Sequence, residues 1–243
     1  MKTNELSVKL NAIMEKWDFS GCISICKDRE VIYQGYHGYA DYEAGKPNDL
    51  ETRFLIASVT KQFTAACIMI LVEEGKINLQ HTLDNYLPEY TYASQITIRQ
   101  MLNMMSGIPD MINEVIVEEI EQDNTERTQK EQLIFEYQTQ SRCFPLSEVL
   151  ELVNNRELNF EPGTSMNYSN TNYSFLGFIV ERLTGQSLGT FMEERIFGPL
   201  HMNETTCNPS MATSIGYARK DGKNVRLGYG NDMSGDGCIV TNA

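Results

Sequence analysis

The sequence predicts an α+β fold in which strands and helices occupy different parts of the chain. Alternating, β-branched segments lie near the N-terminus, whereas apolar residues recur at helical spacing from position 58 to about 200. An Asp-Gly hairpin-turn signature follows at position 221. This order predicts three parts: an N-terminal helix and hairpin over 1–57, a mainly helical region over 58–205, and a return segment over 206–243.

The first part begins with an amphipathic helix over residues 5–17. Its apolar side carries Leu6, Leu10, Ile13 and Met14. Two alternating segments follow, at 20–26 and 31–36, and the polar residues 27–30 separate them. Alternation on both sides of a short polar turn predicts a β-hairpin.

A serine and a lysine three residues apart open the helical part. Ser58-Val-Thr-Lys61 precedes a long apolar run, which predicts a buried helix starting at Ser58. Free N–H groups at a helix start can hold a developing oxyanion, and the macrodipole favours an ionised hydroxyl. Residues i and i+3 share a helix face, so Lys61 is expected beneath Ser58. Apolar neighbours would lower the pKa of the Lys61 ammonium and make it a proton acceptor.

The same tetrapeptide also fits a helix-capping serine followed by an exposed lysine. A second match, Ser24-Ile-Cys-Lys27, provides an internal control. It lies in a predicted strand, where residues i and i+3 point to opposite faces. The helical setting therefore distinguishes Ser58 from Ser24 as a candidate nucleophile.

Tyr168 and Asn170 form a second candidate group. They follow the turn residues Pro162-Gly163 and precede an apolar run at helical spacing over 171–183. A phenol beside an ammonium can have a lowered pKa and relay a proton. The amide of Asn170 offers a donor and an acceptor for a substrate amide. A turn tyrosine and a helix-capping asparagine are the alternative interpretation.

Residues 115–142 are polar and acidic, and we interpret them as a solvated helical excursion near the mouth of a cleft. A lid that shapes substrate choice is the alternative.

Composition excludes several classes of partner. A net charge of −13 and a pI near 4.7 disfavour nucleic acid and anionic membranes. No apolar run approaches the roughly 20 residues that span a bilayer. The six cysteines show no zinc spacing, so we expect no metal, no cofactor and reduced, mostly buried thiols. A Ser-His-Asp triad stays open in principle, but the three scattered histidines fit turn or surface roles better.

Together these motifs resemble the penicillin-recognising serine enzymes, in particular the branch of class C β-lactamases, D-alanyl-D-alanine peptidases and related esterases. Further similar segments occur at 49–64, 71–80, 96–109, 195–202 and 234–240. The resemblance therefore extends along nearly the whole chain. The resemblance implies an antiparallel sheet backed by helices, an all-helical lobe beside it, and a cleft between. It also implies Ser58 as nucleophile, Lys61 and Tyr168 as the proton-transfer pair, and Asn170 as a substrate-amide contact.

The chain departs from that family at three places. Residues 102–107 replace a Leu-Thr-His-Thr-Ser-Gly sequence, and His201 replaces a glycine, which we interpret as packing or turn variations. The third family motif, Lys-Thr-Gly or His-x-Gly on a strand that supplies the second oxyanion N–H, does not occur. We therefore expect a C-terminally truncated form of the fold, by truncation or as a natural short form, with little or no activity.

The leading function is a serine hydrolase that forms an acyl-enzyme on a β-lactam, a D-amino-acid peptide or a small ester. The alternative is a non-catalytic penicillin-binding sensor or interaction module of the same fold. The bare edge of the N-terminal hairpin also predicts self-association, or completion of the sheet by a separate C-terminal piece. The first residues lack a signal-peptide core, so we expect a cytoplasmic location unless a leader was removed.

Overall fold

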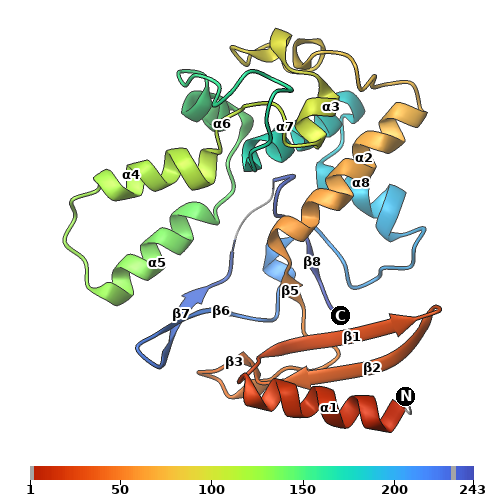
Figure 1. Cartoon of the computed structure of the whole chain (residues 1–243), viewed down its shortest axis with the longest axis vertical. Helices are drawn as coiled ribbons and strands as arrows, with labels where there is room; N and C mark the ends of the chain where they lie inside the picture. The colour runs from red at the N-terminus through yellow and green to blue at the C-terminus, as the bar shows by residue number, and fades with distance from the viewer. Residues whose placement is uncertain (1–2, 231–233) are drawn as a thin grey trace.

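The N-terminal layer is a helix packed on a β-hairpin (Figure 1). In the computed structural model, which describes residues 3–230 and 234–243, this layer comprises α1 (Thr3–Lys16), β1 (Gly21–Lys27) and β2 (Glu30–His37). Both turn residues between the strands have positive φ, 52° at Asp28 and 68° at Arg29. Such a turn matches the natural twist of paired strands. The predicted helix and hairpin are therefore confirmed to within about two residues at each end.

The strands of the described residues form four separate antiparallel pairs. Besides β1–β2, the pairs are β3 (Tyr39–Asp41) with β4 (Lys46–Pro47), β5 (Phe54–Leu55) with β8 (Val240–Thr241), and β6 (Gly216–Lys220) with β7 (Lys223–Gly228). The expected antiparallel pairing is confirmed. Within the described part of the chain these pairs do not join into one sheet.

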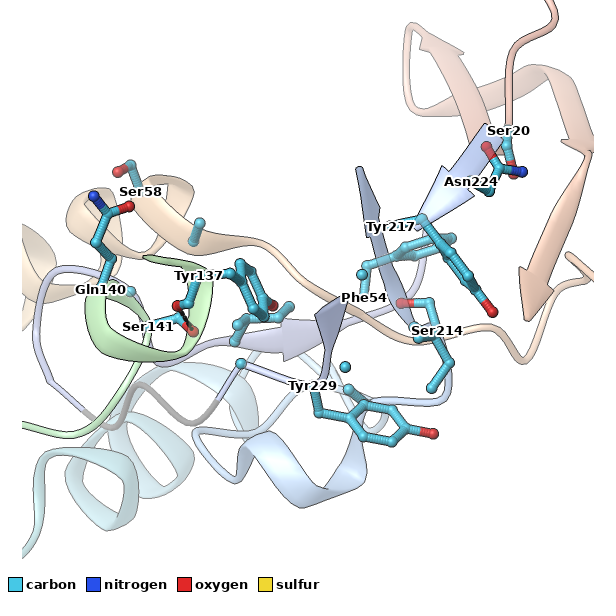
Figure 2. A pocket seen from close by; sticks show the side chains of 18 of the residues that line it. Ser20, Phe54, Ser58, Tyr137, Gln140, Ser141, Ser214, Tyr217, Asn224 and Tyr229 are labelled. Atoms are coloured by element: carbon cyan, nitrogen blue, oxygen red, sulfur yellow. Dashed lines mark hydrogen bonds between the residues drawn. The ribbon is translucent and has the colours of Figure 1, made fainter. Parts of the chain in front are cut away.

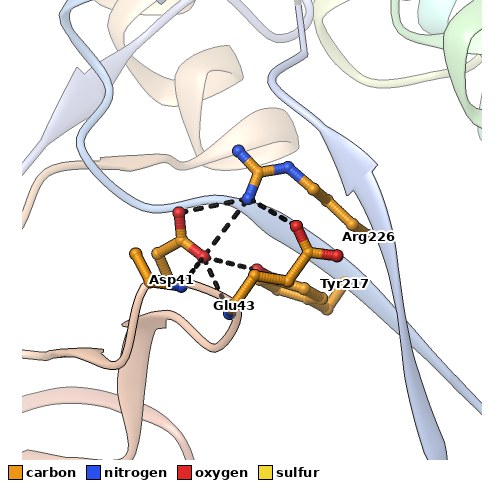
Figure 3. A network of polar contacts seen from close by, with 5 residues as sticks. Asp41, Glu43, Tyr217 and Arg226 are labelled. Atoms are coloured by element: carbon orange, nitrogen blue, oxygen red, sulfur yellow. Dashed lines mark hydrogen bonds and ion pairs between the residues drawn. The ribbon is translucent and has the colours of Figure 1, made fainter.

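The β6–β7 hairpin forms at the predicted Asp-Gly turn, where φ is 50° at Asp221 and 73° at Gly222. An ionic network ties this hairpin to the end of β3 and to Glu43, two residues beyond it (Figure 3). Asp41 accepts hydrogen bonds from the Tyr217 hydroxyl at 2.7 Å and from Arg226, which also pairs with Glu43. The network therefore holds the hairpin beside the N-terminal layer.

The helical part surrounds the hydrophobic core. Its α-helices are α2 (Lys61–Glu73), α3 (Ile98–Leu102), α4 (Val117–Gln122), α5 (Gln129–Gln140), α6 (Leu146–Val153), α7 (Asn170–Thr184) and α8 (Leu188–Met192). Short 3-10 turns occur at Ala57–Thr60, Leu83–Asn85, Ala93–Gln95 and Pro209–Met211, and π-helical turns at Met111–Ile116 and Glu193–Phe197. α2 and α7 pack against each other at the centre, with Leu71, Phe175 and Ile179 among the fully buried side chains. No helix of the described part is long and apolar enough to cross a membrane.

The acidic region is helical, as predicted, but only part of it is solvated. α5 has no buried residue, whereas Val115, Ile116 and Ile120 pack into the interior. These apolar positions lie on one face of the helical turns, with glutamates between them in the sequence. The acidic composition of the region therefore did not reveal that one of its faces is buried.

The cysteines depart from the expectation of mostly buried thiols. All six are reduced, and Cys67, Cys207 and Cys238 are buried. Cys22 is half-buried, and Cys26 and Cys143 are exposed.

Candidate active site

Ser58 lies on a tight turn between β5 and α2. The turn is a 3-10 helix over Ala57–Thr60, and the α-helix itself begins at Lys61, three residues later than predicted. Ala57 has a φ of +44°, a left-handed conformation that costs a non-glycine residue about 1–2 kcal/mol. At Ala57 the chain therefore changes direction between β5 and the helical turn within one residue. The Ser58 side chain that follows is exposed. Its N–H is one of those at a helix start that lack an intrahelical acceptor.

Lys61 lies beneath Ser58, as the spacing predicts. Its side chain is 7% exposed, and its Nζ donates to Ser58 Oγ at 3.1 Å. It also donates to Asn170 Oδ1 at 2.8 Å and to the Asp236 carbonyl at 2.9 Å. The three N–H donors of the ammonium are thus each directed at an oxygen. The apolar run after Ser58 did not indicate these polar partners.

Tyr168 closes the group from the other side. Its hydroxyl lies 2.7 Å from Ser58 Oγ and donates to Asn170 Oδ1 at 3.3 Å. The ring centroid is 5.0 Å from Lys61 Nζ, within cation–π range. The tyrosine is 44% exposed, so one side of it faces solvent. The structure thus brings all four predicted site residues together.

The hydrogen bonds indicate where the serine proton points. Lys61 donates to Ser58 Oγ, and Tyr168 donates its own proton to Asn170. The Ser58 hydroxyl is therefore left to donate to the phenolic oxygen of Tyr168. This order directs the proton of the candidate nucleophile toward a group that can relay it.

The Asn170 amide is held at both ends by the protein. Its Oδ1 accepts from Lys61 and Tyr168, and its Nδ2 donates to the buried carboxylate of Asp110 at 3.1 and 3.2 Å. Asn170 also lines the cleft, so the predicted contact with a substrate amide stays a prediction. Sequence reasoning missed Asp110, which directly follows the segment at 96–109 that resembles the family. The available signal was an aspartate directly after Ser106-Gly-Ile-Pro109, at a position where its side chain can cap the following helical turn. It does so by accepting from the Ile112 N–H.

A segment near the C-terminus forms the floor of the site. The carbonyls of Gly235 and Asp236 accept hydrogen bonds from Thr64 Oγ1, at 2.6 Å, and from Lys61. The Asp236 carboxylate is buried and accepts from the hydroxyl of Ser174 at 2.7 Å and from that of Ser234. The segment at 234–240 was among those that resemble the family, but the sequence indicated no role for it in the site. Its contacts with Lys61 and Thr64 are made by backbone carbonyls, which side-chain patterns do not reveal.

A cleft of about 670 Å³ opens beside Ser58 and runs toward the β6–β7 hairpin. Figure 2 shows Ser58 and Gln140 at one end of the cleft and Tyr217, Asn224 and Ser20 toward the other. Its lining includes six aromatic residues, Tyr39, Tyr42, Phe54, Tyr137, Tyr217 and Tyr229. The end of α5 contributes to one wall, so the acidic region does reach the cleft as predicted.

No group of three or more histidine, cysteine or acidic side chains in the described part of the chain is placed to hold a metal ion.

A family model described as Beta-lactamase matches residues 11–238, which include every residue of this site. The chain belongs to the beta-lactamase family. The enzymes of this family are hydrolases, and the resemblance stated from the sequence is confirmed. The beta-lactamase fold, predicted from the same motifs, is confirmed as well.

Among similar proteins, Penicillin-binding protein 4* of Bacillus subtilis (strain 168) is 29% identical over 206 residues, which cover 84% of this chain and 41% of the relative. Among solved structures, an octameric penicillin-binding protein homologue from Pyrococcus abyssi has a TM-score of 0.74 at 26% identity. That match covers all of this chain and 54% of the homologue. A D-amino acid amidase from Ochrobactrum anthropi SV3, complexed with L-phenylalanine amide, has a TM-score of 0.67 at 25% identity. It covers 91% of this chain and 60% of the amidase. The chain therefore spans about two fifths of the curated relative's length.

Proposed function

We propose that this protein is a serine hydrolase that forms an acyl-enzyme on an amide or ester. The observation that carries the proposal is the position of Ser58 Oγ, which lies 3.1 Å from the Lys61 amine nitrogen and 2.7 Å from the Tyr168 hydroxyl. Nucleophile and proton acceptors within hydrogen-bond reach are what covalent catalysis requires. The family membership adds independent support, since its relatives include a D-amino acid amidase and penicillin-binding proteins.

In the proposed reaction, Ser58 Oγ bonds to the substrate carbonyl carbon while its proton passes to Tyr168 or Lys61. The same pair returns a proton to the leaving nitrogen or oxygen as that bond to the carbonyl carbon breaks. Water then adds to the acyl carbon and releases the acid, and Ser58 regains its proton. β-Lactams, D-amino-acid peptides and small esters all fit this chemistry, and the aromatic residues in the cleft lining favour an apolar or aromatic acyl group.

We further propose that these 243 residues alone turn substrate over slowly or not at all. They contain neither Lys-Thr-Gly nor His-x-Gly after the Tyr168 motif. Loss of one oxyanion donor typically slows an enzyme about 10²–10³-fold. Turnover of nitrocefin or p-nitrophenyl acetate by this chain, at the rate of a longer form of the protein, would contradict this proposal.

Covalent labelling separates the hydrolase from the alternative, a non-catalytic sensor or interaction module. The chain is incubated with a penicillin and, separately, with a fluorophosphonate, and intact mass and peptide mass spectra locate the adduct. A penicillin adduct on Ser58 that decays supports the hydrolase, and one that persists supports a sensor or a peptidase target. With Ser58→Ala as control, no adduct from either reagent would leave only the interaction module.

Self-association is a second proposed property. Within the described residues β1 and β2 pair only with each other, so both outer edges of this hairpin are bare. The related homologue from Pyrococcus abyssi is octameric. Bare edges pair readily with strands of another chain, which supports an assembly through this hairpin.

A further inference from the structure

Two buried groups of opposite charge flank Asn170 without touching each other. Lys61 is 7% exposed and Asp110 is 1% exposed. Within the described residues, neither side chain makes an ion pair within 4.0 Å. A buried charge needs compensation, because burial removes its hydration. Among the residues that the structure describes, Asn170 is the one side chain that hydrogen-bonds to both groups, through Oδ1 to Lys61 and through Nδ2 to Asp110.

The carboxylate of Asp110 decides which way the Asn170 amide points. Its two oxygens accept from the Ile112 N–H at 2.9 Å, the Asn113 N–H at 3.2 Å and the Asn113 side-chain amide at 2.7 Å. Only donors surround it, so it acts as an acceptor throughout and requires a donor from Asn170. The Nδ2 end must therefore face Asp110, and Oδ1 must face Lys61 and Tyr168.

We propose that Asp110 is a positioning residue for the reaction proposed above. It fixes the Asn170 amide, and through that amide it supplies the negative charge that holds the Lys61 ammonium beneath Ser58. The inference rests on the proposed function, and it places the countercharge of Lys61 outside the Ser-x-x-Lys and Tyr-x-Asn motifs.

A purely structural role for Asp110 is the competing explanation, since the same carboxylate caps the π-helical turn Met111–Ile116. Two substitutions separate the roles. Asp110→Asn keeps an oxygen for the cap but removes the charge and permits the Asn170 amide to rotate. Asn113→Ala removes the side-chain amide that donates to the same carboxylate, and it leaves both capping N–H groups and the contact between Asp110 and Asn170 intact.

The main measurement is the rate at which a fluorophosphonate labels Ser58, recorded from pH 5 to 10 on the folded chain. For Asp110→Asn we expect a loss of about 10²-fold, the typical effect of misplacing a reacting group by about 1 Å. We also expect the pH midpoint of labelling to fall, because loss of a nearby negative charge disfavours the ammonium. Asn113→Ala should label within about twofold of the unmodified chain. A merely structural role would lower the melting temperature of Asp110→Asn without moving the midpoint.

Other titratable groups lie close to Lys61 and are unchanged by the two substitutions. Tyr168 and Tyr173 lie with ring centroids 5.0 and 5.9 Å from its Nζ, and Asp236 contacts it through its carbonyl. Glu114, on the turn that Asp110 caps, is engaged with Asn159. Because these groups are the same in both variants, the comparison of midpoints isolates the charge of Asp110.

A double-mutant cycle of melting temperatures gives a second measurement, which does not depend on any reaction of Ser58. It compares Asp110→Asn, Asn170→Ala and the double variant, and an orienting contact predicts melting-temperature losses that do not add. Labelling of Asp110→Asn at the unmodified rate and midpoint would overturn the proposal, and so would additive losses in the cycle. If the unmodified chain is never labelled, the proposed function fails, and non-additive losses would then leave Asp110 as the residue that orients Asn170.

Discussion

The hydroxyl of Tyr168 is the nearer of the two proposed proton acceptors, 2.7 Å from Ser58 Oγ against 3.1 Å for the Lys61 nitrogen. Tyr168→Phe removes this hydroxyl and keeps the ring over Lys61. We expect fluorophosphonate labelling of Ser58 to slow by about 10²-fold or more, the usual contribution of a proton-transfer group. Tyr229→Phe is the matched control, since Tyr229 lines the same cleft and is similarly exposed, at 46%. Equal labelling rates for the two variants would rule out Tyr168 as the relay.

The thiols should differ strongly in reactivity. Burial raises the pKa of Cys67 to about 12, and its side chain is fully enclosed. Cys26 is exposed on β1. Because the thiolate is the reactive form, iodoacetamide at pH 8 should modify Cys26 in the native protein and leave Cys67 unmodified. Peptide mass spectrometry before and after denaturation measures both, and rapid native modification of Cys67 would show that the core opens.

Residue patterns anticipated the side chains that carry motifs and missed those that support them. Helical spacing indicated the contact between Ser58 and Lys61, which is local. The resemblance to a known family, and no local pattern, indicated that Tyr168, 110 residues from Ser58, belongs to the same site. Asp110 is 60 residues from the amide it holds. Such a contact depends on how α7 packs against the π-helical turn, and no local pattern encodes it.

At the scale of elements, the close approach of the segment at 234–239 to α7 positions the floor of the site. A Cβ on Gly235 would lie 2.4 Å from the Tyr173 carbonyl oxygen and 3.1 Å from the Gly177 Cα. Gly235→Ala should therefore push this segment away from Lys61. We expect a lower melting temperature and slower labelling of Ser58.

Gly222→Asn is the control for this substitution, because its Cβ would meet nothing within 4 Å and asparagine tolerates positive φ. Unchanged melting and labelling for Gly235→Ala would mean that the segment adapts without disturbing Lys61.

The contact between the β6–β7 hairpin and the N-terminal layer should weaken in acid. The hydrogen bond from Tyr217, followed by backbone and Arg226 contacts, lowers the pKa of Asp41 from 3.8 to about 2. A carboxyl whose pKa is lowered on folding stabilises the protein above its unfolded pKa. That contribution is lost as the pH falls from about 4 to about 2. The urea midpoints of the protein and of Asp41→Asn should therefore differ above pH 4 and converge near pH 2. A difference that stays constant with pH would contradict this assignment.

The elements that end in characteristic turn or capping residues could be predicted from the sequence, whereas the two-residue strands could not. Asp28-Arg29 and Asp221-Gly222 mark both hairpins, and Gly185, at a φ of 70°, ends α7. The strands β5 and β8 have two residues each and pair across the whole chain. Their pairing follows from tertiary packing, which leaves no periodic trace in so short a segment.

At the scale of the whole molecule, bare hairpin edges and a net charge of −13 act in opposite directions. Edges favour pairing between chains, whereas like charge repels and is screened by salt. We expect light scattering to show oligomers whose share rises with protein concentration and with ionic strength. Val31→Lys, at an exposed position of β2, should reduce that share. A clean monomer at high concentration and high salt would exclude association through this hairpin.

The third acceptor of the Lys61 amine is a carbonyl 175 positions further along the chain. A ribosome adding about 5–20 residues per second needs roughly 9–35 s to travel from one to the other. During that interval Ser58, Lys61 and Thr64 are already part of the nascent polypeptide, while their partners at 235 and 236 are not yet made. The lysine gains its third oxygen partner only after position 236 has been synthesised and has packed against α2.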